Sequence, residues 1–186
     1  MQRIPLVDVE SAPEEVQAAF RQLPVQLNIF RMMAHAPTSF RPLLRLGSSI
    51  LAAQQLDPEL REYAILMAAQ SFGGRYEWIQ HVPIAEACGA TAEQIEAVEK
   101  SDLAAACFDE KEKAFLAFVD ESAKKVRAGD ATFAAMKAHF SDREIVETIL
   151  TIGYYQMMAR LTECTDTEIE EAAGTKVVDS LKPRAK

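Results

Sequence analysis

The chain has 186 residues, a formal net charge of −8 and 49% hydrophobic side chains. This length and composition suffice for one sizeable core and argue against two, so we expect a single domain over residues 1–186. The basic residues are scattered among acids, which argues against a nucleic-acid partner. No apolar run approaches the roughly 20 residues that cross a bilayer, so we expect a cytoplasmic protein with no membrane partner.

Helix signals run through the whole chain, whereas the alternation of apolar and polar residues that marks strands is missing. SAPE at 11–14, TAEQ at 91–94, DEKE at 109–112 and SDRE at 141–144 all have the spacing of a helix capping box. Asp57-Pro58 marks another start, and glycines at 73, 89, 129 and 174 mark stops. We therefore predict an all-α, compact multi-helix bundle, with a ragged tail over residues 175–186 and helices near 12–22, 25–35, 39–55, 58–72, 75–88, 92–100, 110–127, 131–140 and 142–163.

Two of these helices, at 58–72 and 142–163, carry apolar side chains on nearly all sides. A helix without a polar face is a buried helix. One chain of this size has difficulty covering two such helices, so we expect part of their surface to be buried between subunits. The sequence therefore predicts a homo-oligomer.

Three cysteines, Cys88, Cys107 and Cys164, are widely spaced and form no C-x-x-C motif. A local disulfide framework or redox dithiol is therefore not indicated. We expect buried thiols in a reducing compartment. A pair brought together by folding remains open.

The stretch GGRYEWIQH at 73–81 suggests an acid/base site. Glu77 and His81 lie four residues apart, on one face of the predicted helix. Glu62 lies in the apolar helix before the glycine pair, where a carboxylate must be paired or protonated. A short turn between the two helices folds Glu62 back toward His81. We take these three residues as catalytic candidates, with Glu77 held anionic by the helix N-terminus and His81 as the proton carrier.

An alternative interpretation is a helix-capping carboxylate with a histidine partner and no function. Arg75 and Tyr76 flank the candidate site, and Arg75 either binds an anionic substrate group or pairs with Glu62 or Glu77. Trp78, which also suits a packing role, and His35, in the segment MMAHAPTSF, complete the candidates for substrate contact.

The segment REYAILMAAQSFGGRYEWIQHVPIAEACGATAEQIEAV resembles the core of the carboxymuconolactone decarboxylase family, which includes the alkylhydroperoxidase D proteins. The likeness is strongest over residues 57–100, which we take as the family core. It rests on R-E at 61–62, Y-E-W-x-x-H at 76–81 and A-x-x-x-G at 85–89. Weaker likeness reaches NIFRMMAHAP at 28–37 and the last long helix. The resemblance implies an alkylhydroperoxidase D-like helical fold and a trimer or hexamer.

In the peroxidase branch of that family, the resemblance implies a glutamate, a C-x-x-C pair and a histidine that relays protons. Glu62 and His81 match the glutamate and histidine, but Gly74 and Glu77 occupy the two cysteine positions. Peroxidase chemistry needs a thiolate and a resolving thiol, so we expect that activity to be absent. The resemblance then points to the decarboxylase-like branch, in which proton transfer acts on small carboxylated lactones or keto acids without metal or organic cofactor.

Two other hypotheses stay open at this point. A metal site formed by Glu62, Glu77 and His81 lacks a second histidine and the E-x-x-H spacing of di-iron bundles. A non-catalytic oligomer, which binds a small ligand or is only structural, requires no acid/base group. The immediate surroundings of Glu62 and His81 distinguish this last hypothesis from an enzyme.

Overall fold

Helices form all the regular structure of the computed structural model, which describes residues 2–181. Within these residues there is no strand, so the all-α prediction is confirmed. Each of the nine predicted helices is present. The elements are η1 (Val9–Ser11), α1 (Glu14–Phe20), α2 (Asn28–Met33), α3 (Pro37–Ala53), α4 (Pro58–Ser71), α5 (Arg75–Cys88), α6 (Ala92–Glu99), α7 (Glu110–Lys125), α8 (Asp130–His139), α9 (Asp142–Thr165) and α10 (Lys176–Leu181).

The predicted capping boxes form at α6, α7 and α9, where Thr91, Asp109 and Ser141 each cap the helix. The fourth prediction, at 11–14, is wrong. α1 begins after Pro13 without a side-chain cap, because Ser11 turns back to bond the carboxylate and carbonyl of Asp8. Gly129 is also not a stop, since it precedes α8 as its N-cap.

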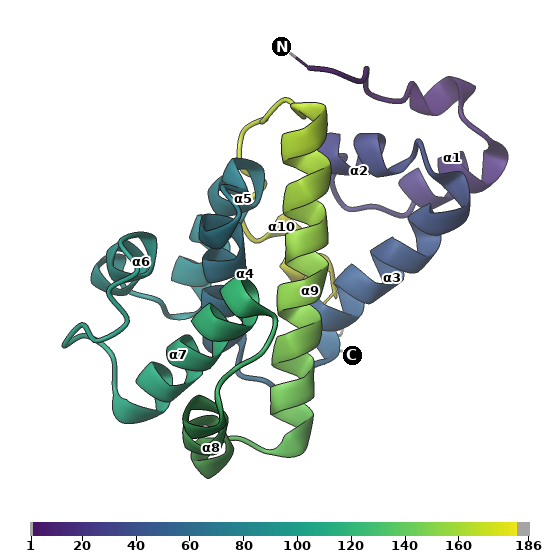
Figure 1. Ribbon diagram of the computed structural model, residues 1–186. Helices are drawn as coiled ribbons and strands as arrows, with labels where there is room; N and C mark the ends of the chain where they lie inside the picture. Colours follow the sequence, from purple (N-terminus) through teal and green to yellow (C-terminus); the bar gives the residue numbers. More distant parts are fainter. Residues whose placement is uncertain (1, 182–186) are drawn as a thin grey trace.

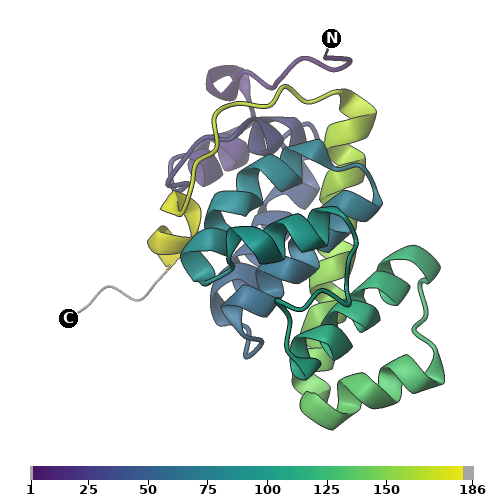
Figure 2. The ribbon, with the colours of Figure 1, turned by 90° about the vertical axis from the view of Figure 1, so that its left-hand side faces the viewer.

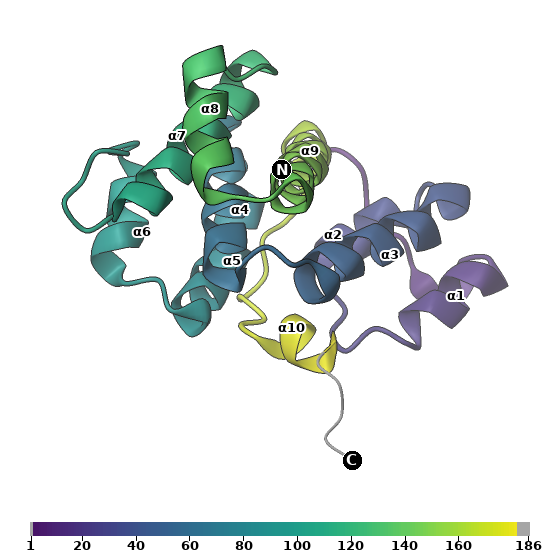
Figure 3. The same ribbon diagram turned by 90° about the horizontal axis from the view of Figure 1, so that it is seen from below.

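The centre of the molecule is formed by α4 and α9, which pack against each other and against most other helices. Figure 3 shows α9 between two groups, with α4 to α8 on one side and α1 to α3 on the other. Each side has its own apolar core. Residues of α4 and α9 belong to both cores, with Leu66 and Ile152 in one and Ile65 and Met158 in the other. The shared helices support our proposal of one domain, which was predicted for residues 1–186.

α4 is buried along almost its whole length, as the sequence predicted. α9, the long upright helix in front in Figure 1, is covered on one side only. Four large apolar side chains of its N-terminal and middle turns are exposed, namely Val146, Ile149, Leu150 and Met157. None of the helices within residues 2–181 is long and apolar enough to span a bilayer.

The residues after α9, which we call the C-terminal segment (residues 166–181), are ordered and turn back across the molecule. Asp166 ends α9 in a left-handed conformation with φ of 49°. Figure 2 shows the segment leaving the top of α9 and running down past the N-terminal helices to α10. The prediction of a ragged tail is therefore wrong for 176–181, where α10 packs on α3. Positions 182–186 of that prediction lie outside the described residues.

Candidate active site

The turn between α4 and α5 folds the two helices against each other. Gly73 adopts φ of 64°, a left-handed conformation that ends α4. Gly74 is needed for a different reason, because it allows a close approach of α9. A β-carbon on Gly74 would lie 2.8 Å from the Cβ of Ala159 and 2.9 Å from Oε2 of Glu77. The predicted double-glycine turn thus also sets how tightly α5 packs on α9.

This turn brings Glu62 of α4 to His81 of α5. Oε2 of Glu62 lies 2.8 Å from Nδ1 of His81, and Glu62 is fully buried while His81 is 9% exposed. The other carboxylate oxygen, Oε1, accepts from Nε of Arg61 at 3.0 Å and Nη2 at 2.9 Å. A buried carboxylate needs such partners to stay ionised. Glu62 is therefore a satisfied anion bonded to a histidine.

The bond to Glu62 also fixes which nitrogen of His81 is available for chemistry. Because an ionised carboxylate only accepts, Nδ1 of His81 carries the hydrogen and Nε2 is left unprotonated in the neutral ring. The ring of Tyr155 packs edge-on against the imidazole, with centroids 4.8 Å apart and planes at 87°. Burial raises the pKa of the Tyr155 hydroxyl, so this side chain orients the ring and does not compete for its proton.

Glu77 occupies a separate environment one turn before His81. Its two carboxylate oxygens lie 3.1 and 3.2 Å from the hydroxyl of Thr162 on α9. Burial raises the pKa of the Glu77 carboxyl from 4.5 to about 7, against the opposing effects of hydrogen bonds and of His81. From the sequence, the helix N-terminus was predicted to hold this group anionic. Desolvation outweighs the helix terminus, so Glu77 is only partly ionised near pH 7.

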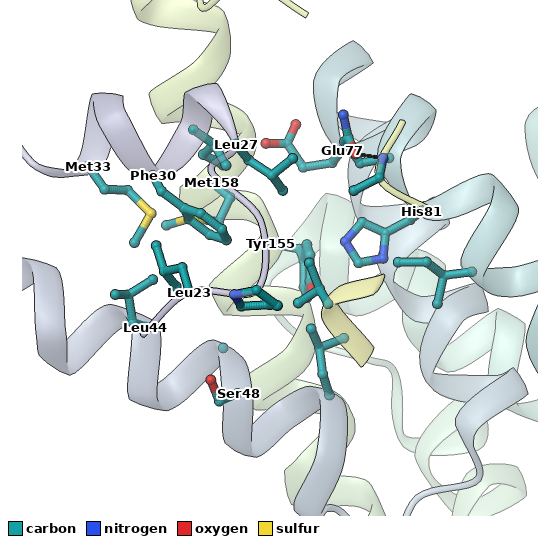
Figure 4. A pocket seen from close by; sticks show the side chains of 18 of the residues that line it. Leu23, Leu27, Phe30, Met33, Leu44, Ser48, Glu77, His81, Tyr155 and Met158 are labelled. Atoms are coloured by element: carbon teal, nitrogen blue, oxygen red, sulfur yellow. Dashed lines mark hydrogen bonds between the residues drawn. The ribbon is translucent and has the colours of Figure 1, made fainter. Parts of the chain in front are cut away.

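His81 and Glu77 both line a cavity of about 440 Å³ enclosed by α2, α3, α5, α9 and the C-terminal segment. Figure 4 shows the imidazole of His81 pointing into this space, opposite apolar side chains of α2 and α3. Most of the wall is apolar or aromatic. Its large apolar members are Leu23, Leu27, Ile29, Phe30, Met33, Leu44, Leu51, Ile84, Tyr154, Tyr155 and Met158. A cavity of this size and lining is typical of small-molecule sites.

Of the four candidates for substrate contact, only Tyr76 lines the cavity. Its hydroxyl donates to Oε1 of Glu170 at 2.6 Å and accepts from the backbone of Ile29 at 3.2 Å. Arg75 is exposed on the surface, where its backbone N–H bonds Glu163. It is not the arginine that pairs with Glu62.

Trp78 and His35 also lie outside the cavity wall. Trp78 packs against the core formed around α4, α6 and α7. His35 is exposed, with Nε2 2.7 Å from the carbonyl of Pro5. Neither side chain is placed to contact a ligand in this cavity.

Three further residues that were not predicted from the sequence contribute to the site. Arg61 holds Glu62, Thr162 holds Glu77, and Gln80 lines the cavity beside His81. Arg61 had a visible signal, since it is the only basic residue in the apolar helix that carries Glu62. Thr162 lies 85 residues from Glu77. Nothing in the sequence relates the two.

The cysteines lie away from this chemistry. None of the three lines the cavity within the described residues. Cys107 is half-buried and Cys164 exposed, both as free thiols, so the expectation of buried cysteines is wrong for Cys164. Cys88 is half-buried, with Sγ 3.9 Å from Nη2 of Arg61. No group of three or more potential metal-binding side chains occurs among residues 2–181.

Comparison with known proteins agrees with this geometry. Residues 37–121, from α3 into α7, match the model of the carboxymuconolactone decarboxylase family. This segment contains Glu62, Glu77 and His81. The match covers a little under half of the chain. The matched segment is wider than the expected core at 57–100, and no curated protein shows significant similarity to the chain.

Solved structures show that the whole chain has the fold of the alkylhydroperoxidase D-like superfamily. A peroxidase-related protein from Ralstonia eutropha, described as an alkylhydroperoxidase D core, superposes with a TM-score of 0.78 at 17% identity, covering 98% of both chains. A putative antioxidant defence protein from Agrobacterium tumefaciens gives 0.66 at 24% identity, covering 72% of this chain and 92% of its own.

A third structure is the debrominase Bmp8, with a TM-score of 0.73 at 19% identity, covering 95% of this chain and 96% of its own. A cysteine-to-alanine variant of Bmp8 is known in complex with 2,3,4-tribromopyrrole. At these identities the likeness establishes the fold only. The segment that matches the family model therefore keeps the glutamate and histidine of the expected motif and has Gly74 and Glu77 where the resemblance places cysteines.

Proposed function

We propose that this protein is a cofactor-free acid/base enzyme that moves a proton on a small molecule held in the cavity. The observation that carries this proposal is the 2.8 Å bond between Glu62 and His81 at a cavity wall. A general base needs a free nitrogen near the substrate and a partner that stabilises the charge it acquires. Nε2 of His81 is that nitrogen, and Glu62 stabilises the imidazolium.

The family resemblance suggests two reactions for these groups. In proton transfer, Nε2 of His81 takes a proton from a carbon next to a carbonyl. The electron pair of the broken C–H bond moves onto the carbonyl oxygen and returns when the carbon is reprotonated. In decarboxylation, the C–C bond breaks, carbon dioxide leaves, and protonated His81 delivers a proton to the carbon. Glu77 is a second proton donor or acceptor, because its carboxyl has a pKa of about 7.

Alkylhydroperoxidase activity is disfavoured by the composition of the site. That mechanism needs a thiolate at the reacting centre and a second thiol to resolve the sulfenic acid. Gly74 and Glu77 stand at the two expected cysteine positions, and the described cavity wall contains no cysteine. We therefore expect the purified protein to consume cumene hydroperoxide no faster than buffer, with or without dithiothreitol.

A substrate screen tests the catalytic proposal. Small carboxylated lactones and β-keto acids, with neutral ketones as a third set, are incubated in D₂O and followed by proton NMR. His81→Ala should lower turnover or deuterium incorporation by about 10²- to 10⁴-fold. The matched control is His139→Ala, since His139 is exposed at the end of α8. Equal rates for wild type and His81→Ala would remove His81 from catalysis.

The largely apolar cavity also suits a second candidate function, the binding of a small ligand without chemistry. The same samples separate the two possibilities. A pure binding protein would hold compounds from the screen with no conversion, and His81→Ala would leave the conversion rate at its background value.

A further inference from the structure

The charge of the cavity wall narrows the kind of molecule that fits. Among the described residues that line it there is no lysine or arginine. Within residues 2–181, Glu77 is the only carboxylic acid of the wall and His81 the only other ionisable group apart from tyrosines. The nearby Arg61 is not part of the wall and is already bonded to Glu62 and to the carbonyl of Leu51.

A carboxylate placed in this cavity would lack a permanent cation to pair with. Burying an unpaired carboxylate is strongly unfavourable, and the negative charge of an ionised Glu77 would add repulsion. The charges of Arg61 and Glu62 offset each other, so this pair provides no net positive charge beside the wall. The wall is thus suited to uncharged ligands and unsuited to anions.

Gln80 adds a specific polar requirement. This side chain is 6% exposed and lines the cavity. Its Oε1 accepts from the backbone N–H of Ala173 at 3.0 Å, which fixes the orientation of the amide. Its Nε2 is buried and has no hydrogen-bond partner among residues 2–181. An unsatisfied buried donor is costly, and a ligand oxygen that accepts from it would remove the cost.

The volume sets the size of the ligand. A dry cavity of about 150 Å³ holds one benzene molecule. The present cavity, at about 440 Å³, has room for two fused rings or one ring with substituents. The aromatic and aliphatic walls favour such an apolar framework.

We infer that the cavity takes an uncharged, ring-sized carbonyl compound, whose oxygen accepts a hydrogen bond from Gln80 while His81 removes a proton from the adjacent carbon. The part of this inference that concerns His81 rests on the proposed function. Of the two reactions above, it selects proton transfer, since a decarboxylation substrate carries a carboxylate. The C–H electron pair moves to the carbonyl oxygen and the same proton equivalent returns, so no oxidant or reductant is consumed.

Three compounds of one shape test the ligand class, namely 2-tetralone, its hydrocarbon counterpart tetralin, and tetralin-2-carboxylate. Binding is measured by titration with NMR detection, independently of reaction. The wild-type protein should bind 2-tetralone at least about tenfold more tightly than the carboxylate. Equal or tighter binding of the carboxylate, or no binding of 2-tetralone at millimolar concentration, overturns the inference.

A matched pair of lysine substitutions tests the role of charge. Ser48 lines the cavity from α3, whereas its neighbour Ser49 does not. Ser48→Lys should tighten binding of the carboxylate about tenfold, and Ser49→Lys should leave it unchanged. The variant Lys182→Gln/Arg184→Gln/Lys186→Gln removes the basic residues beyond the described part and should keep the wild-type preference. Loss of the preference in that variant contradicts the assignment to the wall.

Gln80→Met tests the hydrogen bond. This substitution removes both the Nε2 donor of Gln80 and its hydrogen bond with Ala173. Tetralin has no carbonyl oxygen, so the change in its affinity measures the effect of losing the Ala173 contact alone. The ratio of 2-tetralone to tetralin affinity should fall by about fivefold to tenfold. An unchanged ratio contradicts the role of Gln80.

Deuterium exchange into bound 2-tetralone reports catalysis separately. If 2-tetralone binds but exchanges no deuterium, the inferred ligand class holds and the proposed function is wrong. If only tetralin-2-carboxylate exchanges deuterium, the proposed function holds and the inferred ligand class is wrong.

Discussion

The hydroxyl of Thr162 bonds both carboxylate oxygens of Glu77, at 3.1 and 3.2 Å, and so joins α5 to α9 beside the cavity. A hydroxyl can donate only one proton, and it also lies within hydrogen-bond distance of the carbonyls of Met158 and Ala159. The contact with Thr162 lowers the pKa of the Glu77 carboxyl, but burial raises it more, so the pKa of Glu77 is about 7.

The raised pKa predicts a pH dependence of stability. Glu77 binds its proton more tightly in the folded state, at about 7, than at the usual 4.5 of an unfolded chain. Its contribution to stability is therefore complete below pH 4.5 and is lost as the pH rises to 7. Urea unfolding at several pH values should show this loss, up to about 3 kcal/mol, in wild type relative to Glu77→Gln. Glu86→Gln, an exposed change on α5, should keep the wild-type slope.

The two histidines that bond fixed acceptors should have opposite tautomers. Nδ1 of His81 faces a carboxylate, whereas Nε2 of His35 lies 2.7 Å from the carbonyl of Pro5. Since both acceptors only accept, neutral His81 carries its hydrogen on Nδ1 and neutral His35 on Nε2. Nitrogen-15 NMR above neutral pH distinguishes the two forms. A hydrogen on Nε2 of neutral His81 would show that the Glu62 contact does not set the tautomer of His81.

The close approach at Gly74 predicts an unusual sensitivity to a single methyl group. Gly74→Ala places a β-carbon 2.8 Å from that of Ala159 and should destabilise the protein by about 1–3 kcal/mol. The control is Gly153→Ala on α9, where nothing lies within 4 Å and the gain in helix propensity should be about 0.5–1 kcal/mol. Thermal and urea unfolding measure both. Ala159→Gly should restore part of the loss caused by Gly74→Ala.

The exposed apolar residues of α9 support the prediction of a homo-oligomer. Val146, Ile149 and Leu150 are 53%, 47% and 51% exposed and share one face of the helix. Such a face usually marks an interface. Light scattering coupled to size-exclusion chromatography should show an oligomer that Ile149→Glu dissociates and Ile4→Glu, at an exposed residue of the N-terminal stretch, does not. A monomeric wild type at micromolar concentration would contradict the prediction.

The C-terminal segment should contribute to ligand binding. Oε1 of Glu170 bonds the hydroxyl of Tyr76 and the backbone N–H of Asn28, which ties the segment to α5 and α2. Ala173, Gly174 and Val177 then complete the cavity wall. Glu170→Ala should weaken binding of 2-tetralone about tenfold and speed proteolytic cleavage after α9, because the anchored segment would open more often. The neighbouring exposed change Glu171→Ala should do neither.

The features that were predicted correctly from the sequence depend on residues that lie close together in the chain. Capping boxes at Thr91, Asp109 and Ser141 are read from four consecutive residues, and the Glu62–His81 contact follows from two helices joined by a short turn. These features do not depend on distant segments.

The parts that were missed depend on packing between distant segments. Glu62 pairs with Arg61 of its own helix and not with Arg75. An almost wholly apolar helix shows no preferred face in sequence, so the sequence did not identify Arg61 as the partner. Likewise the burial of Glu77 depends on α9, 85 residues away. α10 has six residues and is stabilised by its packing on α3 rather than by strong local signals.

The tight contact at position 74 constrains how this chain could change over evolutionary time. A cysteine at 74 would place its β-carbon 2.8 Å from that of Ala159, so a thiol pair at 74 and 77 requires a change on α9 in addition to two cysteine substitutions. Selection would have to tolerate the change on α9 before a thiol pair brought any benefit.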